Sequence, residues 1–457
     1  MTTRRATSLA ALGALALAAG LVAGCGPRET DRLALVGATV VDGSGGAPLR
    51  DVVIIVRAGR IDTIAPRGRV EIPKSAERID LTGRWIIPGL IDAHAHATRW
   101  ALPRYLAAGI TTLRDVHGHQ DSILALRNEV NLNAVVGPRL FVAGAMIDGA
   151  PATYPDAAAV GGEGEARKAV DQRAIADVDF VKTYTRITPD LLRAILDEAT
   201  TLQLPVTAHL GLTDAVTAAR LGVRAIEHLS GIPEAALADP APLYAAHRQG
   251  FFAGWNASER SWARLDSAGL ARVARALAER RTILVPTLVV HENLSRADAP
   301  DALAHPDIAV MPDSEIVRWN LPDLIRRAGW TAGDFAAFRA ARAQQDLFVR
   351  EFRAAGGTIV AGSDASNQLL PPGPSLHREL ELLVNAGLTP GDALLAATRN
   401  AAELLGADSL GRVRPGAAAD LVVLDADPLV DIRNTRRVER VMLRGRLLDA
   451  DSIRQHW

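Results

Sequence analysis

Residues 86–96 read Ile86-Ile87-Pro88-Gly89-Leu90-Ile91-Asp92-Ala93-His94-Ala95-His96. The apolar run predicts a buried strand that ends at a pair of histidines. In a strand, residues two positions apart point to the same face, so the side chains of His94 and His96 can reach a single ion. An H-x-H pair is a weak signal alone. Its value depends on whether further ligands follow other strands at equivalent places.

The sequence beyond this strand alternates short apolar runs with amphipathic stretches. Seven further strands are predicted, over residues 111–115, 140–143, 180–183, 206–209, 225–228, 283–286 and 358–364. Helices are predicted between them, for example over residues 189–203 with Thr188 as the N-cap. Eight strand–helix units in sequence predict an α/β fold of the (β/α)8 TIM-barrel type, formed by residues 86–411. A doubly wound sheet shares the alternation, but no glycine-rich phosphate turn follows the first strand.

Both ends of the chain have a different texture, with short strand-like runs broken by glycine and proline. We expect residues 33–85 and 412–457 to combine into one small β-sandwich domain beside the barrel. The segment 289–334 interrupts the alternation after the seventh predicted strand. Because the loops after barrel strands lie at the mouth where active sites form, this segment is a candidate lid.

The beginning of the chain predicts export. Arg4 and Arg5 precede an apolar run over residues 9–23, which is too short for a secure membrane span and is typical of a signal peptide over residues 1–24. Val22-Ala23-Gly24-Cys25 resembles a bacterial lipobox, and a chance cysteine after an apolar stretch is the alternative. The resemblance implies lipidation on Cys25, with residues 25–32 as a linker. The expected location is the bacterial cell envelope, on the periplasmic face of the outer membrane where two membranes exist, by the general secretory or the twin-arginine route.

Charge, cysteine content and length limit the kinds of partner, cross-link and assembly that the chain can have. The 457 residues carry a formal net charge of -1, which gives no bulk attraction to nucleic acid. Cys25 is the only cysteine, so no intramolecular disulfide can form. A chain of this length can bury a large hydrophobic core. The sequence does not fix the oligomeric state, and a homo-oligomer is one possibility.

Polar side chains recur at the carboxyl ends of the predicted barrel strands, the face on which barrel enzymes build their sites. They are His94, His96, Lys182, His209, His228 and Asp364. Imidazole and carboxylate groups are ligands that suit Zn²⁺ and similar divalent ions. Each residue alone is more often structural, and a protonated lysine has no lone pair to donate. Together, six such side chains at the ends of five strands predict a metal centre.

Several motifs in this set resemble the amidohydrolase superfamily of metal-dependent hydrolases. The resemblance rests on residues 88–96, on Ile226-Glu227-His228 and Gly362-Ser363-Asp364, and on the tail segment 416–422, and it runs from about residue 33 to residue 449. It implies two divalent ions, of which Zn²⁺ is the expected choice, with His94, His96 and Asp364 on one ion. It further implies His209 and His228 on the other ion, and a CO₂-derived carbamate on Lys182 as the bridge between them. In the implied mechanism a metal-bridging hydroxide attacks the scissile carbonyl, and Asp364 acts as the catalytic general acid and base.

Within this superfamily, the local sequence is most similar to the branch that contains imidazolonepropionases and Xaa-Pro dipeptidases. Imidazolonepropionase works with one metal and does not use this lysine, so Lys182 favours the dipeptidase side. We therefore predict a hydrolase of amide C–N bonds in small-molecule substrates, either dipeptides or N-acyl amino acids. One alternative is a hydrolase of cyclic amides, lactones or organophosphate esters with the same metals. Another is a non-enzymatic metal- or solute-binding lipoprotein, which the presence of Asp364 disfavours.

The sequence constrains the substrate-binding residues less well. Tyr184 could donate a hydrogen bond to a substrate carbonyl, although it could equally be a packing residue. His291 and Ser366 follow the seventh and eighth predicted strands and are further candidates for the pocket. Arg186 or Arg114 could hold a substrate carboxylate, and each could instead be structural.

Overall fold

The structure is a computed structural model that describes residues 32–309 and 311–455. The predicted signal peptide, Cys25 and nearly all of the predicted linker lie outside the described residues. Within the described part of the chain, no helix is both long enough and apolar enough to cross a membrane.

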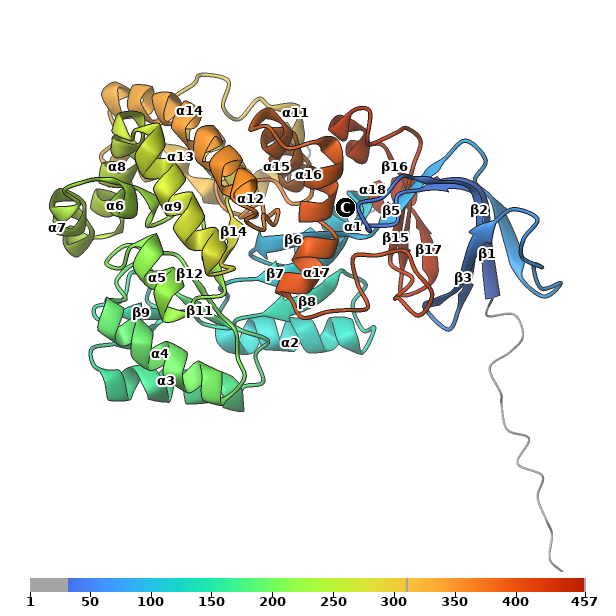
Figure 1. Cartoon of the computed structure of the whole chain (residues 1–457), viewed down its shortest axis with the longest axis horizontal. Coiled ribbons are helices and arrows are strands. Elements are labelled where there is room, and N and C mark those ends of the chain that lie inside the picture. Colours follow the sequence, from blue (N-terminus) through green and yellow to red (C-terminus); the bar gives the residue numbers. More distant parts are fainter. Residues whose placement is uncertain (1–31, 310, 456–457) are drawn as a thin grey trace, which may run out of the picture.

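Strands from both ends of the chain form one eight-stranded sheet. The strands are β1 (Arg32–Val40), β2 (Leu49–Arg57), β3 (Arg60–Pro66), β4 (Glu77–Asp80), β5 (Trp85–Pro88), β15 (Leu421–Leu424), β16 (Val438–Leu443) and β17 (Arg446–Asp449). Their order is β17-β16-β15-β5-β1-β2-β3, with β4 paired to β1. In Figure 1 the blue N-terminal strands and the red C-terminal strands lie side by side at one end of the molecule. The small β domain predicted from both chain ends is therefore confirmed.

The barrel forms the rest of the molecule. Its regular strands are β6 (Leu90–Ala95), β7 (Ile110–Asp115), β8 (Arg139–Val142), β11 (Val181–Thr183), β12 (Val206–Ala208), β13 (Ala225–Glu227) and β14 (Ile283–Val285). The eighth predicted strand is an extended segment that pairs only through single bridges, from Ile359 to Leu284 and from Ala365 to Ala95. These two bridges connect β14 to β6 and close the barrel, which confirms the predicted TIM-barrel fold.

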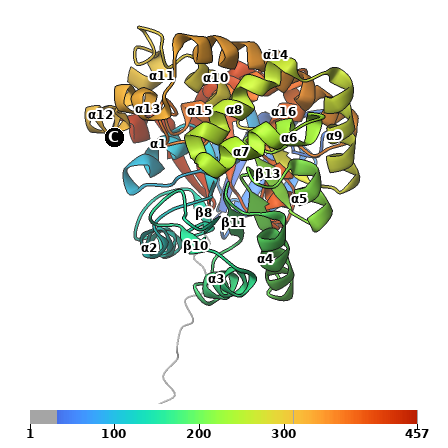
Figure 2. The same ribbon diagram turned by 90° about the vertical axis from the view of Figure 1, so that its left-hand side faces the viewer.

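Two short strands, β9 (Ile147–Gly149) and β10 (Ala158–Val160), extend the barrel sheet beside β11 and were not predicted. The helices are α1 (Leu102–Ala107), α2 (Gln120–Asn131), α3 (Glu163–Ile175), α4 (Pro189–Thr201), α5 (Ala215–Leu221), α6 (Ile232–Ala236), α7 (Ala241–Gln249), α8 (Phe251–Ser261), α9 (Ser267–Glu279), α10 (Leu288–Ser295), α11 (Pro306–Ala309), α12 (Asp313–Trp319), α13 (Leu321–Ala328), α14 (Ala332–Ala354), α15 (Pro374–Asn385), α16 (Pro390–Ala396), α17 (Arg399–Leu404) and α18 (Ala450–Arg454), with 3-10 turns η1 (Arg99–Ala101), η2 (Trp262–Arg264) and η3 (Ile432–Arg436). In Figure 2 helices α2, α3, α4, α9 and α14 lie toward the edges of the view, whereas α6, α7 and α8 lie across its middle, on the side of the barrel that faces the viewer.

Helix α4 shows why the amphipathic stretches become the outer layer. The Thr188 side chain accepts a hydrogen bond from the backbone N–H of Leu191, as the N-cap prediction requires. One face of the helix then buries Leu192, Ile195 and Ala199 against the barrel core, while polar residues face outward.

The run that was predicted as one strand over residues 86–96 is two strands, and this prediction was wrong. The backbone N–H of Gly89 donates to Asp420 in the small sheet, whereas that of Leu90 donates to Gly109 beside the barrel. A Cβ atom on Gly89 would lie 2.1 Å from Thr111 Oγ1, so only glycine allows the two sheets to approach here. Residues 86–88 thus belong to the small sheet, and the barrel begins at Leu90.

The segment 289–334 folds into helices α10 to α13 with an apolar cluster of its own. Trp319, Leu324 and Trp330 are buried in this cluster together with Phe335 of the following helix. Leu324 and Trp330 also line the main cavity of the barrel mouth. The segment is therefore placed where a lid would act, and its motion stays a prediction.

Candidate metal centre and active site

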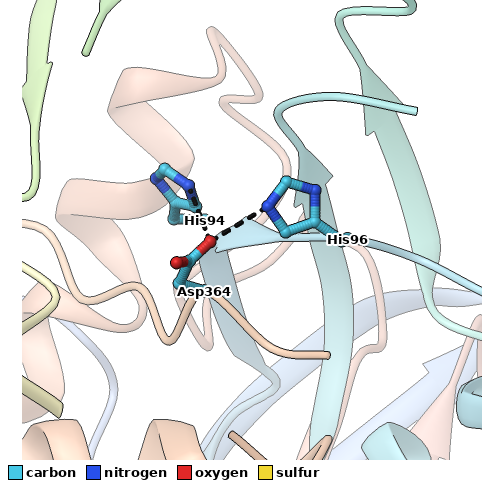
Figure 3. Close-up of side chains that lie close together, drawn as sticks. All are labelled: His94, His96 and Asp364. Carbon is cyan, nitrogen blue, oxygen red and sulfur yellow. Dashed lines mark hydrogen bonds and ion pairs between the residues drawn. The ribbon is translucent and has the colours of Figure 1, made fainter. Parts of the chain in front are cut away.

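The H-x-H pair meets the aspartate of the eighth barrel segment. The Nε2 atoms of His94 and His96 lie 3.2 Å and 3.0 Å from the same oxygen, Oδ1 of Asp364. Figure 3 shows both imidazole rings directed at this carboxylate. One ligand atom from each of the three residues falls within 4.8 Å of the others, which is the spacing of a site for one ion.

The other ring nitrogen of each histidine is held by the protein. Nδ1 of His94 lies 2.7 Å from Oε2 of Glu227, and Nδ1 of His96 lies 2.9 Å from the carbonyl oxygen of His117. Both partners are acceptors, so each Nδ1 carries a proton. Each Nε2 therefore faces Asp364, where it can give a lone pair to a cation or, with no cation bound, share a proton with the carboxylate. Two lone pairs and an anionic oxygen that converge in this way require a cation or a shared proton between them.

The remaining predicted ligands lie beside this group. The ring of His228 is centred 4.2 Å from that of His94, and 4.7 Å from that of His209. His228 Nδ1 is 2.7 Å from Thr287 Oγ1, while Nδ1 of His209 is buried without a hydrogen-bond partner among the described residues. These residues and Lys182 line the same cavity, which has a volume of about 740 Å³. All six predicted ligands are thus brought together.

Burial and neighbouring charges set the protonation of these groups. Burial lowers the pKa of the Lys182 amine to about 8, so the neutral amine is more populated than in an exposed lysine. Burial would also lower the pKa of His96, but the hydrogen bond and charge of Asp364 outweigh it and raise this pKa to about 9. Burial would raise the pKa of Asp364, yet its contacts with His94 and His96 hold it well below the usual range.

Glu227 contacts the candidate ligand His94, a position that the sequence did not reveal. Its carboxylate is fully buried, and while Oε2 meets His94, Oε1 lies 2.9 Å from Nη1 of Arg114 and accepts from the Thr207 hydroxyl. Burial would raise the pKa of Glu227, but the charges of Arg114 and His94 keep it well below its ordinary value. Glu227 therefore remains anionic and orients the His94 ring.

The three predicted substrate residues have different positions. Tyr184 lines the cavity, and its ring is centred 4.7 Å from that of His209. His291 does not line the cavity: its Nε2 contacts the carbonyl oxygen of His228, and its ring stacks behind Trp255. Ser366 is also absent from the cavity wall, where the neighbouring Asn367 is found instead. Asn367 donates from Nδ2 to Asp364 Oδ1 over 2.9 Å.

An aromatic wall makes up much of the rest of the cavity. Its members are Tyr154, Tyr184, Phe251, Phe252, Trp255 and Trp330. Phe251, Phe252 and Trp255 come from α8, one of the helices between β13 and β14. The sequence motifs did not predict Phe251, Phe252 or Trp255 as cavity residues, because these three residues lie on a helix and not at the end of a barrel strand.

Comparison with known proteins agrees with the fold. Residues 85–448 match the model of the amidohydrolase family. An imidazolonepropionase of Cereibacter sphaeroides is 27% identical over 442 residues, covering 91% of this chain and 98% of that protein. A dihydroorotase of Anaeromyxobacter dehalogenans is 28% identical over 426 residues, covering 87% of this chain and 89% of that protein.

Solved structures give the same picture. The crystal structure of a candidate prolidase from Bifidobacterium longum matches with a TM-score of 0.68 and 25% identity, covering 93% of this chain and 98% of that one. The family model spans well over half of the chain, and it coincides with the barrel whose mouth gathers the histidines and the aspartate. The chain therefore belongs to the amidohydrolase family of metal-dependent hydrolases that act on carbon–nitrogen bonds.

Proposed function

We propose that the protein hydrolyses the amide bond of dipeptides or N-acyl amino acids at a centre for two divalent metal ions, with Zn²⁺ the expected ion. The observation that carries the proposal is the meeting of six potential ligands in one cavity, with Lys182 among the histidines. The candidate prolidase with a similar structure supports the dipeptide class.

The residues fit such a centre chemically. His94, His96 and Asp364 offer two nitrogen lone pairs and one carboxylate to a first ion. His209 and His228 would serve a second ion, and Lys182 would bridge the two as a carbamate, since the plain ammonium form cannot bind a cation. When bound, the ions would supply an activated water and polarise the scissile carbonyl.

The chain's own residues supply proton transfer and orientation. The carboxylate of Asp364 takes a proton from the attacking water and passes it to the leaving nitrogen, a step that commonly contributes about 10²–10⁴ in rate. Asn367 orients this carboxylate through its bond to Oδ1. Glu227 holds His94, and the aromatic wall excludes water from the reacting amide.

The test combines elemental analysis with a substrate panel. Purified protein loaded with Zn²⁺ is expected to hold about two ions per chain and to cleave members of a dipeptide and N-acyl amino acid panel. Asp364→Asn is expected to retain metal and lose turnover. A metal-loaded protein that cleaves no member of the panel would contradict the proposed substrate class.

A second candidate function is cyclic-amide hydrolysis, which the similarity to a dihydroorotase favours. The same metals and the same aspartate would serve it. Cyclic amides, lactones and organophosphate esters assayed beside the linear amides separate the two functions. A preference for the ring substrates, measured as kcat/KM, would select this second function.

A further inference from the structure

An arginine without an anionic partner lines the active-site cavity. Arg186 and Arg327 both contribute to the cavity wall. Nε of Arg327 lies 2.7 Å from Asp323, a carboxylate that also pairs with Arg326, so Arg327 has an anionic partner. Nε of Arg186 is buried with no hydrogen-bond partner, and among residues 32–309 and 311–455 no carboxylate reaches its guanidinium. Arg114, the other arginine that the sequence offered for substrate binding, is committed to Glu227.

The backbone of Arg186 is fixed by its surroundings. Its N–H donates to Oδ1 of Asp148 over 2.9 Å, and this fully buried carboxylate also accepts from the backbone N–H groups of Gly149 and Thr153. A Cβ atom on Gly149 would lie 2.2 Å from the carbonyl oxygen of Arg186, so the two backbones are in close contact. The guanidinium therefore extends from a rigid point on the loop that follows Lys182.

A guanidinium in a partly enclosed site is stable when an anion pairs with it, and its planar donors match a carboxylate. Asp148 does not fill this role, because the contacts of its oxygens are with backbone N–H groups. The aromatic wall, including Phe251, Trp255 and Trp330, offers an apolar surface in the same cavity. The cavity thus combines a place for one carboxylate with a place for a bulky apolar group.

We infer that Arg186 binds the free carboxylate of the substrate, so that the enzyme selects amides that carry both a carboxylate and a large apolar or aromatic group. The inference rests on the proposed amide-hydrolase function and specifies its substrate. Arg186 is a specificity residue, and its effect should depend on the presence of the carboxylate.

Binding of a ligand that cannot be hydrolysed tests this inference directly. The probe is the ketomethylene analogue of N-benzoylphenylalanine, in which CH₂ replaces the amide N–H, together with the same compound with a carboxamide in place of the carboxylate. Calorimetry with the zinc-loaded wild-type protein is expected to show the acid binding about 10- to 100-fold more tightly than the carboxamide, as for a hydrogen-bonded charge. Arg186→Gln should remove this preference, and Arg186→Lys should retain part of it.

Arg327→Gln is the matched control, since it removes a cavity arginine that is already paired with Asp323. It should leave the preference for the acid unchanged. An equal preference in the wild type and in Arg186→Gln would overturn the inference, because the carboxylate would then be held elsewhere, for example by the metal ions.

Kinetics provide a second readout. With N-benzoylphenylalanine as substrate, Arg186→Gln should raise KM much more than it lowers kcat, and turnover of the corresponding carboxamide should be unaffected. An intact binding preference without turnover of any amide would contradict the proposed function and leave the assignment of Arg186 standing. Turnover by Arg186→Gln with an unchanged KM would contradict the assignment of Arg186 and leave the proposed function standing.

Discussion

Replacing Glu227 by glutamine should weaken metal binding without touching a metal ligand. The wild-type carboxylate accepts from Nδ1 of His94 with one oxygen and from Arg114 with the other. Glutamine has a single side-chain oxygen. If that oxygen stays with Arg114, the amide N–H₂ faces Nδ1 of His94 and favours the opposite tautomer. The proton then sits on Nε2, and the lone pair that should face the metal is lost.

The magnitude follows from two costs. Loss of the partner that orients a metal-binding histidine typically lowers metal affinity by about 10- to 100-fold, or about 1.4–2.8 kcal/mol. Removal of the charge also leaves the guanidinium of Arg114 buried, and a broken buried ion pair costs about 3–5 kcal/mol of stability. Arg114 keeps its bond to the carbonyl oxygen of Ala93 and its place 4.2 Å over the Phe180 ring. We therefore expect Glu227→Gln to lower the free energy of unfolding by about 3 kcal/mol, the lower end of this range.

The assay is competition with a fluorescent chelator for Zn²⁺, paired with urea unfolding of the metal-free protein. Glu234→Gln is the matched control, because Glu234 is an equally buried glutamate that pairs with His247 over 2.9 Å and touches none of the predicted ligands. The control should lose stability and keep its metal affinity. Wild-type metal affinity in Glu227→Gln would refute the orienting role of this carboxylate.

Three further predictions concern other parts of the chain. Lys182→Met should lower the bound metal from about two ions to about one per chain by elemental analysis, and an unchanged ratio would contradict a bridging role. His377 is buried between Thr435 and Ala108, and burial, with the charge of Arg436, lowers its pKa from 6.5 to about 3. The folded state therefore holds it neutral, and its contribution to stability is full above about pH 6.5 and is lost as the pH falls toward 3. The expected loss is about 3 kcal/mol near pH 4.5, and His377→Gln should show a correspondingly flatter pH dependence of urea unfolding. Cys25→Ser should shift the expressed protein from the membrane fraction to the soluble fraction on ultracentrifugation, whereas equal partition of both forms would argue against the lipid anchor.

The sequence predicted the fold and the gathering of the ligands because both depend on strand position. Residues at the carboxyl ends of parallel barrel strands share one face. The positions of His209 and His228, directly after β12 and β13, were therefore enough to place them beside His94. The same rule predicted that Lys182, in β11, would lie on the wall of the same cavity, where the structure has it.

The same rule failed where the backbone is not a strand. His291 follows the seventh strand closely, but it lies on α10, where neighbouring residues point about 100° apart. Val290 consequently lines the cavity while His291 turns behind Trp255. The exclusion of Ser366 from the cavity wall has a related cause, because the chain after Asp364 leaves the extended segment and loses the strand period. Local spacing could not predict either orientation.

The pairing of β5 with β15 has a consequence for the order of folding. Ile86 pairs with Val423, and the chain reaches the first two histidines of the centre only a few residues after β5. A contact between residues so distant in the chain closes a very long loop, which is slow and entropically costly. The strand that anchors the H-x-H segment is thus completed only when the last strands of the polypeptide arrive. Nascent or C-terminally truncated chains should therefore lack a competent metal centre even though every ligand has already been synthesised.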